Sequence, residues 1–409
     1  MASSKNSLLV GAAGLVVGAG IGYAAACMMG EKKDEKKKKA SATCPATEWP
    51  QGKPVYTASY PAYDLADQDA SFMRVGDMLI EEILSELPRG YEMPPREVKW
   101  IEEMLHYNVK GGKMNRGKMV VASMIELAKH QGIELSPTDI SKYAVLGWCV
   151  EWMQAWLLMA DDVMDDSQTR RGHPCWYKLD KVQKIAINDA FTVEMLVFKL
   201  LKRHFGQETY YLQLLDLFLE TTFQTECGQL LDTLCMNLTV EDFSVERWTL
   251  IVKYKTAFYS FYASVAMAMV VFGIEDREAY DAAREVLMVM GIYFQAQDDF
   301  LDCYGTPEQI GKIGTDIQDK KCGWLFCQAY HHIASPEQKA VLKENYGHWD
   351  DAKVEVVKQL YRDMDLETLY RAYEEESYKE IMAMKPKVEA LLPWSIFEIF
   401  LGKVYKRSK

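Results

Sequence analysis

The stretch AWLLMADDVMDD, residues 155–166, ends a strongly apolar run in a cluster of aspartates, and MVMGIYFQAQDDFLD, residues 288–302, repeats this design. In each DDxxD motif the outer aspartates are four residues apart, a spacing that puts both on one face of a helix. Two such helices facing each other would bring six carboxylates to one cavity. These are Asp161, Asp162, Asp165, Asp298, Asp299 and Asp302.

So many carboxylates remain ionised together only when cations lie among them. Hard oxygen ligands with room for water and phosphate oxygens suit Mg²⁺, so the two motifs predict a multi-magnesium site that binds a diphosphate. A single DDxxD motif on a helix would more often be a solvated acidic face. Two copies, each at the end of an apolar segment, favour the metal site.

The bulk composition narrows the class of protein. A chain of 409 residues, of which 49% are hydrophobic, can form one large domain or two ordinary ones. A net charge of −12 argues against nucleic acid as a partner. The nine cysteines form no CxxC pair and no zinc spacing, which indicates reduced thiols rather than a disulfide framework.

Most of the chain carries the pattern of helices. From residue 64 onward, long segments show helical apolar periodicity, separated by glycine and proline, and strand signals are almost absent. We therefore expect a single all-α domain over residues 64–409, built as one large helical bundle. Polar sites in such bundles form from side chains on facing helices, as the two aspartate motifs require.

The N-terminal part has the pattern of a separate unit. Residues 7–29 are uncharged and long enough to span a bilayer as a helix. Lysines are concentrated at residues 31–39, which by the positive-inside rule places the rest of the chain on the cytosolic side. We expect residues 1–30 to be a transmembrane anchor in the endoplasmic reticulum or an organelle envelope, followed by a charged segment and linker over residues 31–63. The alternative is a cleaved targeting peptide, with a cleavage region at Ala24–Ala26, that directs the protein to an organelle.

Basic residues stand beside both acidic motifs, near breaks in the helical pattern. They are Lys113 and Arg116 in GGKMNRG, Arg170 and Arg171 after the first aspartates, and Lys312, Lys320 and Lys321 after the second. Alone, each group is typical of a surface patch. Beside carboxylates that hold metal, they predict contacts to phosphate oxygens that the metal leaves uncovered.

Lys255 differs from these, because it interrupts a long apolar helical region at an expected helix break. Such a lysine either extends its ammonium group to solvent at a helix end or contacts the diphosphate.

Five motifs together resemble those of the trans-isoprenyl diphosphate synthases, and most closely the eukaryotic farnesyl diphosphate synthases. They are GGKMNRG (111–117), DDVMDDSQTRRG (161–172), VKYKTAFYSFY (252–262), FQAQDDFLD (294–302) and GKIGTDIQDKK (311–321), in the family's order and spacing. The resemblance covers roughly residues 65–409. It implies an isoprenoid synthase fold, a homodimer, and a prenyltransferase that condenses isopentenyl diphosphate head to tail with dimethylallyl or geranyl diphosphate to give farnesyl diphosphate.

The resemblance also implies roles for individual residues. Three Mg²⁺ ions per active site would be held by Asp161, Asp165 and Asp298, with Asp162, Asp299 and Asp302 orienting the water around them. The allylic diphosphate would contact Arg170, Lys255 and Lys312, and isopentenyl diphosphate would bind at Lys113, Arg116, Gln154 and Arg171. The allylic cation would be shielded by Lys255, Thr256 and Gln295. Further substrate-binding residues would be Gln229, Asp232, Tyr259 and Lys321.

Product length depends on how far the apolar cavity extends below the aspartates. Trp156 and Leu157 stand five and four residues before Asp161, which is ~6–7.5 Å further down a helix at 1.5 Å per residue. Trp156 should block the cavity floor, whereas Leu157 is smaller than the aromatic residue typical of farnesyl synthases. We expect a C15 product, with geranyl or geranylgeranyl diphosphate as alternatives.

Two other functions stay open. A terpene cyclase uses the same scaffold, but it usually replaces the second aspartate motif and would leave Lys113, Arg116 and Arg171 idle. A non-catalytic regulatory subunit would be expected to lose some of the aspartates or basic residues, and none is missing. The sequence assigns no role to Asp166.

Overall fold

The computed structural model describes residues 58–306 and 314–405. The predicted membrane segment at residues 7–29, most of the linker, and Lys312 lie outside these ranges. Within the described part, no helix is both long and apolar enough to cross a membrane.

The predicted helical domain over residues 64–409 lies within the described part of the chain, apart from residues 307–313 and 406–409.

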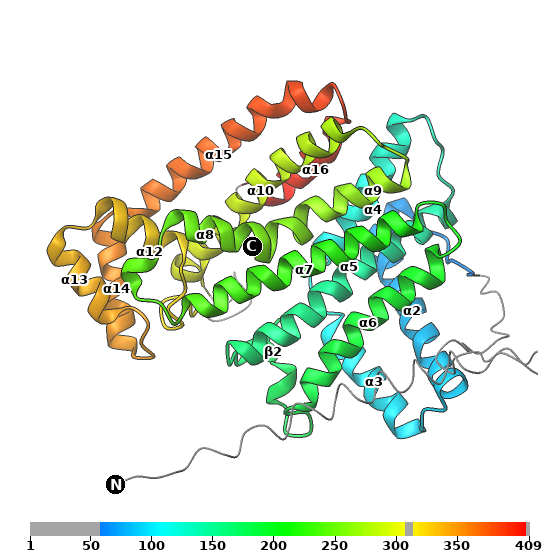
Figure 1. Cartoon of the computed structure of the whole chain (residues 1–409), viewed down its shortest axis with the longest axis horizontal. Helices are drawn as coiled ribbons and strands as arrows, with labels where there is room; N and C mark the ends of the chain where they lie inside the picture. The colour runs from blue at the N-terminus through cyan, green and yellow to red at the C-terminus, as the bar shows by residue number, and fades with distance from the viewer. Residues whose placement is uncertain (1–57, 307–313, 406–409) are drawn as a thin grey trace, which may run out of the picture. The chain divides into compact units, whose positions relative to one another are not determined.

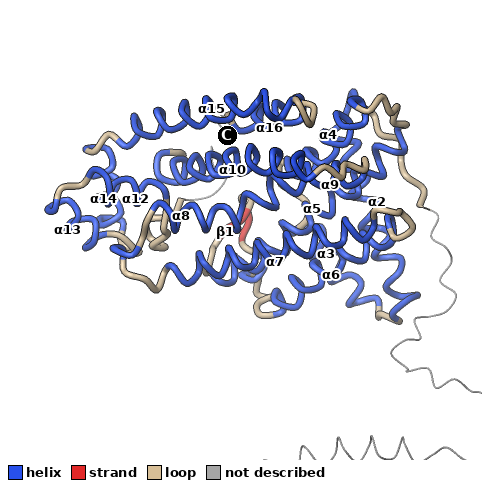
Figure 2. Tube along the Cα trace, turned by 45° about the horizontal axis from the view of Figure 1, so that its top comes forward, coloured by secondary structure: helices blue, strands red, loops and turns tan. Residues whose placement is uncertain are grey.

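The described body is almost entirely helical, which confirms the predicted fold class (Figures 1 and 2). Its α-helices are α2 (Gln68–Tyr91), α3 (Pro95–Asn108), α4 (Asn115–His130), α5 (Pro137–Met164), α6 (Ile185–Phe205), α7 (Tyr211–Cys235), α8 (Val245–Val252), α9 (Ala263–Val271), α10 (Arg277–Tyr304), α12 (Trp324–Gln328), α13 (Pro336–Asn345), α14 (Asp351–Asp363), α15 (Leu366–Glu389) and α16 (Trp394–Val404). Shorter helical segments are η2 (Leu65–Asp67), η3 (Trp176–Lys178), η4 (Val240–Asp242) and η6 (Ala329–Ile333).

Helix α5 carries the first aspartate motif and is buried on nearly all sides. A proline in its first turn, Pro137, and a capping box between Ser136 and Asp139 fix its start. A helix that is apolar around most of its circumference belongs inside a core, and α5 packs against both α4 and α6. This packing holds the aspartates at its C-terminal end in a defined position.

Helix α10 carries the second motif and packs against the π-helix η5 (Lys253–Tyr262) and against α15. Most of its buried apolar residues up to Tyr293 belong to the main core of the molecule, whereas Ala296 and Phe300 belong to a smaller core with α8 and α12–α15. The second aspartate motif therefore lies where α10 passes from one core to the other.

A helix break was predicted at Lys255, and this prediction was wrong. The chain continues in helical conformation from α8 through η5 into α9. Segments of π-helix occur frequently at functional sites. Glycines on two neighbouring helices allow a close approach: a Cβ on Gly228 of α7 would collide with the backbone nitrogen of Lys255, and one on Gly291 of α10 would collide with Ala257. Backbone packing from two sides thus fixes the position of Lys255.

A short hairpin follows the first aspartate motif. Strand β1 (Thr169–Arg170) pairs antiparallel with β2 (His173–Pro174), and the turn residues Arg171 and Gly172 have φ of +53° and +80°. Two positive φ values in a two-residue turn suit the twist of paired strands. Figure 2 shows the short red strand among the helices. Two-residue strands are too short to show alternation, so the sequence pattern did not predict them.

Candidate active site

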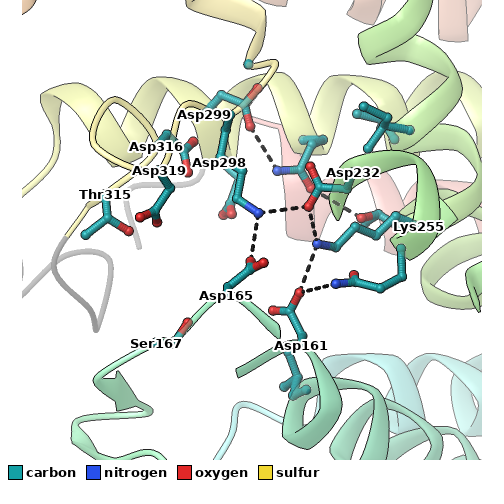
Figure 3. A pocket seen from close by; sticks show the side chains of 18 of the residues that line it. Asp161, Asp165, Ser167, Asp232, Lys255, Asp298, Asp299, Thr315, Asp316 and Asp319 are labelled. Carbon is teal, nitrogen blue, oxygen red and sulfur yellow. Dashed lines mark hydrogen bonds and ion pairs between the residues drawn. The ribbon is translucent and has the colours of Figure 1, made fainter. Parts of the chain in front are cut away.

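A cavity of about 520 Å³ opens between α5, α7, η5 and α10 (Figure 3). Loop residues within 165–170, after α5, and within 315–323, after α10, complete its lining. Part of the wall is apolar and includes Leu157, Leu158 and Phe294. Cavities of this size, with an apolar wall and a few convergent polar groups, commonly bind small molecules.

Most of the predicted site residues reach this cavity. They are Arg116, Gln154, Leu157, Asp161, Asp165, Arg170, Gln229, Asp232, Lys255, Thr256, Tyr259, Gln295, Asp298, Asp299 and Lys321. Six described residues that were predicted for the site do not line it: Lys113, Trp156, Asp162, Arg171, Asp302 and Lys320.

The aspartates of the two motifs approach the cavity from opposite sides. Figure 3 shows Asp161 and Asp165 on one side and Asp298 and Asp299 on the other. Between them lies Asp232 of α7, which the family resemblance assigned to substrate binding.

Asp232 is the centre of a chain of ion pairs that joins α5, α7, η5 and the loop after α10. Its Oδ2 is 2.6 Å from Lys255 Nζ and 2.9 Å from Lys321 Nζ. Lys255 Nζ also lies 3.0 Å from Asp161 Oδ1, and Lys321 Nζ lies 2.7 Å from Asp165 Oδ2 (Figure 3). Two lysines therefore neutralise carboxylates that the sequence assigned to metal.

These pairs keep their groups charged. Burial by itself raises the pKa of Asp161, but the positive charges of Lys255, Arg170 and Lys321 outweigh it and hold that pKa well below its ordinary value. The pKa of Asp232 is lowered by the two lysines in the same way, against the effect of burial. Conversely, burial alone would lower the pKa of Lys321, and the surrounding aspartates raise it. The cavity thus presents fixed cations and fixed anions side by side.

Two more donors orient Asp161. Gln229 Nε2 donates to its Oδ1 at 3.0 Å, and Arg170 Nη2 donates to its Oδ2 at 3.3 Å. Gln229 was predicted to bind substrate; in the structure its side chain lines the cavity and donates a hydrogen bond to Asp161 of the first motif.

Asp162 and Asp302 have structural partners instead of facing the cavity. Asp162 is buried and accepts from Arg170 Nε at 3.0 Å and Nη2 at 2.6 Å, since successive helical residues are rotated by about 100°. Asp302 should share a face with Asp298, but the chain at Gly314 covers it, and Asp302 Oδ2 accepts from the Asp316 amide at 3.0 Å. Six carboxylates were predicted to converge on one cavity. In the structure only four of the six line it: Asp161, Asp165, Asp298 and Asp299.

The side chains as they stand form no metal centre, since no group of three or more potential ligand residues in the described part of the chain is placed to hold an ion. One observation nevertheless fits a cation. Asp165 Oδ1 is buried beside the cavity without a hydrogen-bond partner, while its Oδ2 bonds to Lys321. A hard oxygen atom without a donor is suited to Mg²⁺.

Asp299 is held by three donors. Trp248 Nε1 donates at 2.9 Å and the Trp324 amide at 2.7 Å to Oδ2, and Gln295 Nε2 donates at 2.9 Å to Oδ1. Burial raises the pKa of Asp299 to about 6, although these bonds oppose the shift. Gln295 Oε1 in turn accepts from Thr256 Oγ1 at 3.4 Å, so the predicted catalytic residues Thr256 and Gln295 are brought together.

The residues predicted to bind the second diphosphate are only partly assembled. Arg116 lines the cavity, donates from Nε to Ser260 Oγ at 2.8 Å, and lies over the Tyr259 ring at 5.0 Å. Arg171 points elsewhere and donates from Nη1 to the carbonyls of Asn108 and Lys110.

Sequence reasoning missed a buried carboxylate beneath this region. Glu151 on α5 is 2% exposed, and its Oε1 accepts from the Gly117 amide at 2.7 Å, in the first turn of α4. It therefore links α5 to the helix that carries Arg116. The sequence feature that could have indicated this buried carboxylate is a glutamate within the otherwise apolar run of α5.

Of the two residues predicted to set the product chain length, Leu157 lines the cavity and Trp156 does not. Leu157 lines the cavity with Leu158, whereas Trp156 is buried in the main core and does not line it. A residue five positions before Asp161 is rotated roughly 140° around the helix, which turns Trp156 away. The α5 side of the wall is therefore aliphatic at this level, whereas α10 contributes Phe294.

Comparison with known proteins agrees with this arrangement. Residues 98–364 match the family model described as polyprenyl synthetase. The chain belongs to the polyprenyl synthetase family. It is a prenyltransferase with the isoprenoid synthase fold, as the motifs predicted.

Its similar relatives include farnesyl pyrophosphate synthases of two yeasts. That of Saccharomyces cerevisiae is 47% identical over 343 residues, which cover 83% of this chain and 97% of the relative. That of Candida albicans is 46% identical over 343 residues, with the same shares. Among solved structures, Trypanosoma brucei farnesyl diphosphate synthase complexed with risedronate has a TM-score of 0.77 at 34% identity, covering 83% of this chain and 99% of that one.

Proposed function

We propose that this polyprenyl synthetase family member is a farnesyl diphosphate synthase that joins isopentenyl diphosphate head to tail to dimethylallyl and then geranyl diphosphate. The observation that carries the proposal is the cavity in which Lys255, Asp232 and Lys321 link the aspartates of the first motif beside an apolar wall. The names of the similar yeast relatives support the C15 product.

Three Mg²⁺ ions are proposed at Asp161, Asp165 and Asp298, where they would stabilise the charge of the departing diphosphate. Around them, Lys255, Lys321 and Arg170 supply N–H donors for phosphate oxygens. Without substrate, these three cationic side chains form ion pairs with aspartates of the site. When substrate enters, they can exchange the aspartate partner for a phosphate oxygen.

The chain's own residues then handle the allylic cation and the second substrate. Oxygen atoms of Thr256 and Gln295 lie on the cavity wall, where they can face the positive charge. Arg116 and Gln154 bind the diphosphate of isopentenyl diphosphate, and Ser260 and Tyr259 hold the Arg116 guanidinium in place. The departed diphosphate takes the proton, so no separate base is required.

The test is release of inorganic pyrophosphate from dimethylallyl and isopentenyl diphosphates with Mg²⁺. We expect release only when both substrates and the metal are present, and chelation of the metal should abolish it. Release from the allylic substrate alone with a cyclised hydrocarbon as the product would support the terpene cyclase instead, and no release with any combination would support a non-catalytic subunit.

Geranylgeranyl diphosphate synthase is the second candidate, because Leu157 rather than Trp156 lines the cavity. An aliphatic side chain on the α5 side of the wall leaves more room than an aromatic one. A C20 product would favour this candidate.

We further propose a homodimer that forms through α6 and α7. Helix α7 exposes Leu212, Leu219, Phe223, Leu230 and Leu234. Their spacing of seven, four, seven and four residues places them along one stripe of the helix. Phe191 and Met195 of α6 are each 60% exposed, and large apolar patches of this kind mark interfaces.

Residues 7–29 lie outside the described part of the chain, and for them we propose the membrane anchor inferred from hydropathy, with the enzyme facing the cytosol. A tether of this kind would hold the enzyme near others that use its amphiphilic product. Cell fractionation of the full chain and of residues 46–409 tests it. Equal recovery in the membrane fraction would exclude the anchor.

A further inference from the structure

Trp349 has the highest solvent exposure among the large apolar side chains of the described part of the chain, at 71%, and yet it lines the active-site cavity. It lies in the loop between α13 and α14. An indole has a large apolar surface, so a solvent-exposed position is unfavourable unless something covers it in the working state. None of the motifs that define the site includes this residue.

The loop around Trp349 is fixed on both sides. Tyr346 Oη donates to the Lys321 carbonyl at 2.7 Å, and the Gly347 amide donates to the Ile317 carbonyl at 2.9 Å. Gly347 has φ of +83°, which only glycine adopts readily, and Asp350 caps α14 by accepting from the Ala352 amide at 2.9 Å. The loop backbone is therefore anchored on both sides of Trp349, which keeps the indole beside the cavity opening.

That place is at the diphosphate end of the cavity. The segment to which the loop is bonded contributes Asp316, Asp319 and Lys321 to the lining, and Lys321 bridges Asp165 and Asp232. The apolar end, by contrast, is formed by α5 and α10 side chains such as Leu157 and Phe294. A largely apolar indole among charged groups at the cavity opening is poorly suited to bind phosphate, but it can exclude water.

We propose that Trp349 covers the diphosphate end of the cavity when substrate is bound and acts as a positioning residue that keeps water from the allylic cation. This proposal rests on the proposed function. In elongation, the allylic C–O bond breaks with its electron pair leaving on the diphosphate, the isopentenyl double bond forms the new C–C bond, and a proton passes to the diphosphate. If water adds instead, its oxygen forms a C–O bond, the diphosphate takes its proton, and the product is an allylic alcohol.

The ratio of allylic alcohol to elongated product therefore measures how well water is excluded. We expect Trp349→Ala to raise this ratio about fivefold or more and to weaken binding of inorganic pyrophosphate with Mg²⁺ about tenfold, because an uncovered site stays hydrated. Trp349→Phe should stay near wild type. Ile133→Ala removes another exposed apolar side chain, 44% exposed and outside the cavity lining, and should change neither quantity.

Fluorescence gives a readout that needs no turnover. The emission of Trp349, taken as wild type minus Trp349→Phe, should shift to shorter wavelength when inorganic pyrophosphate and Mg²⁺ are added, since the indole leaves water. An unchanged difference spectrum, or a Trp349→Ala variant with the alcohol ratio and pyrophosphate affinity of wild type, would overturn the proposal. If the wild type itself does not elongate, the proposed function fails, and the fluorescence and pyrophosphate measurements still decide the role of Trp349.

Discussion

At the scale of single residues, the two lysines that share Asp232 explain how a cluster of buried carboxylates is stable before substrate arrives. Each lysine also pairs with an aspartate of the first motif, Lys255 with Asp161 and Lys321 with Asp165. An unpaired buried charge is costly, and a close pair with further hydrogen bonds offsets part of that cost. The same pairing places cations where phosphate oxygens would arrive.

Lys321→Met tests this arrangement. We expect kcat/KM for elongation to fall about a hundredfold or more, because charge-assisted bonds to phosphate, Asp165 and Asp232 are lost together. Steady-state kinetics measure the effect. The neighbouring Lys320 is the control: its Nζ donates to the carbonyls of Met236 and Leu238 and does not line the cavity. Lys320→Met should lower the free energy of unfolding with little change in kcat/KM, and equal kinetic losses in both variants would contradict the account.

Glu151 makes a prediction about pH. Burial raises the pKa of this carboxyl above its ordinary value of 4.5, although the Gly117 amide and the charges of Arg116 and Arg171 oppose the shift. The folded protein thus keeps a proton that the unfolded chain has released, so the stabilisation is present at low pH and is lost as the pH rises through the folded pKa.

Glu151→Gln removes this dependence, since the side-chain amide oxygen can still accept from Gly117. We expect the free energy of unfolding of wild type, relative to this variant, to decrease as the pH rises from about 4 to 7. Denaturant titrations at several pH values provide the comparison. A relative stability that increases with pH would show that the sign is wrong.

At the scale of elements, the π-helix η5 positions Lys255 and Thr256 through close packing with α7 and α10. Gly228→Ala would push a Cβ into the Lys255 backbone, and overpacking of this kind costs about 1–3 kcal/mol. We expect the variant to lose that much stability and also to lose activity, because Lys255 shifts relative to Asp161 and Asp232.

The matched control is Gly402→Ala in α16, where an added Cβ meets nothing within 4 Å. Alanine is favoured over glycine inside a helix by roughly 0.5–1 kcal/mol, so this variant should be slightly more stable and fully active. Thermal unfolding together with the elongation rate distinguishes the two. A fully active Gly228→Ala variant would argue against the role given to η5.

The sequence predicts much of this architecture, for identifiable reasons. Apolar periodicity predicts the helices, and i, i+4 spacing predicts that Asp161 and Asp165 share a face, because both depend only on local helix geometry. The cover over Asp302 comes from the chain at Gly314, and such a tertiary contact leaves no local signal.

The same limit applies to the other differences. The π-helix η5 depends on glycines in α7 and α10, which are distant in sequence from Lys255. Trp156 was expected at the cavity floor from its distance along the helix, but its rotation about the helix axis places it in the core. The central position of Asp232 between two lysines likewise follows from the packing of α7.

At the scale of the whole molecule, the apolar stripe on α6 and α7 predicts the assembly state. Phe223 is 62% exposed on this stripe, and Phe223→Glu would place a charge in the proposed interface. We expect wild type to sediment as a dimer and the variant to shift toward monomer at micromolar concentration. Leu65→Glu, at a position that is 51% exposed on η2, should leave the dimer intact. A wild-type protein that sediments as a monomer at every concentration would exclude the interface.

The central claim is that the assembled cavity elongates an allylic diphosphate to fifteen carbons and then stops. The most direct measurement is incubation of the enzyme with isopentenyl diphosphate, Mg²⁺ and, separately, the C5, C10 and C15 allylic diphosphates, with the products sized by mass spectrometry. We expect the C5 and C10 starters to be converted to farnesyl diphosphate and the C15 starter not to be extended. Absence of elongation from every starter, or a cyclised hydrocarbon as the product, would contradict it.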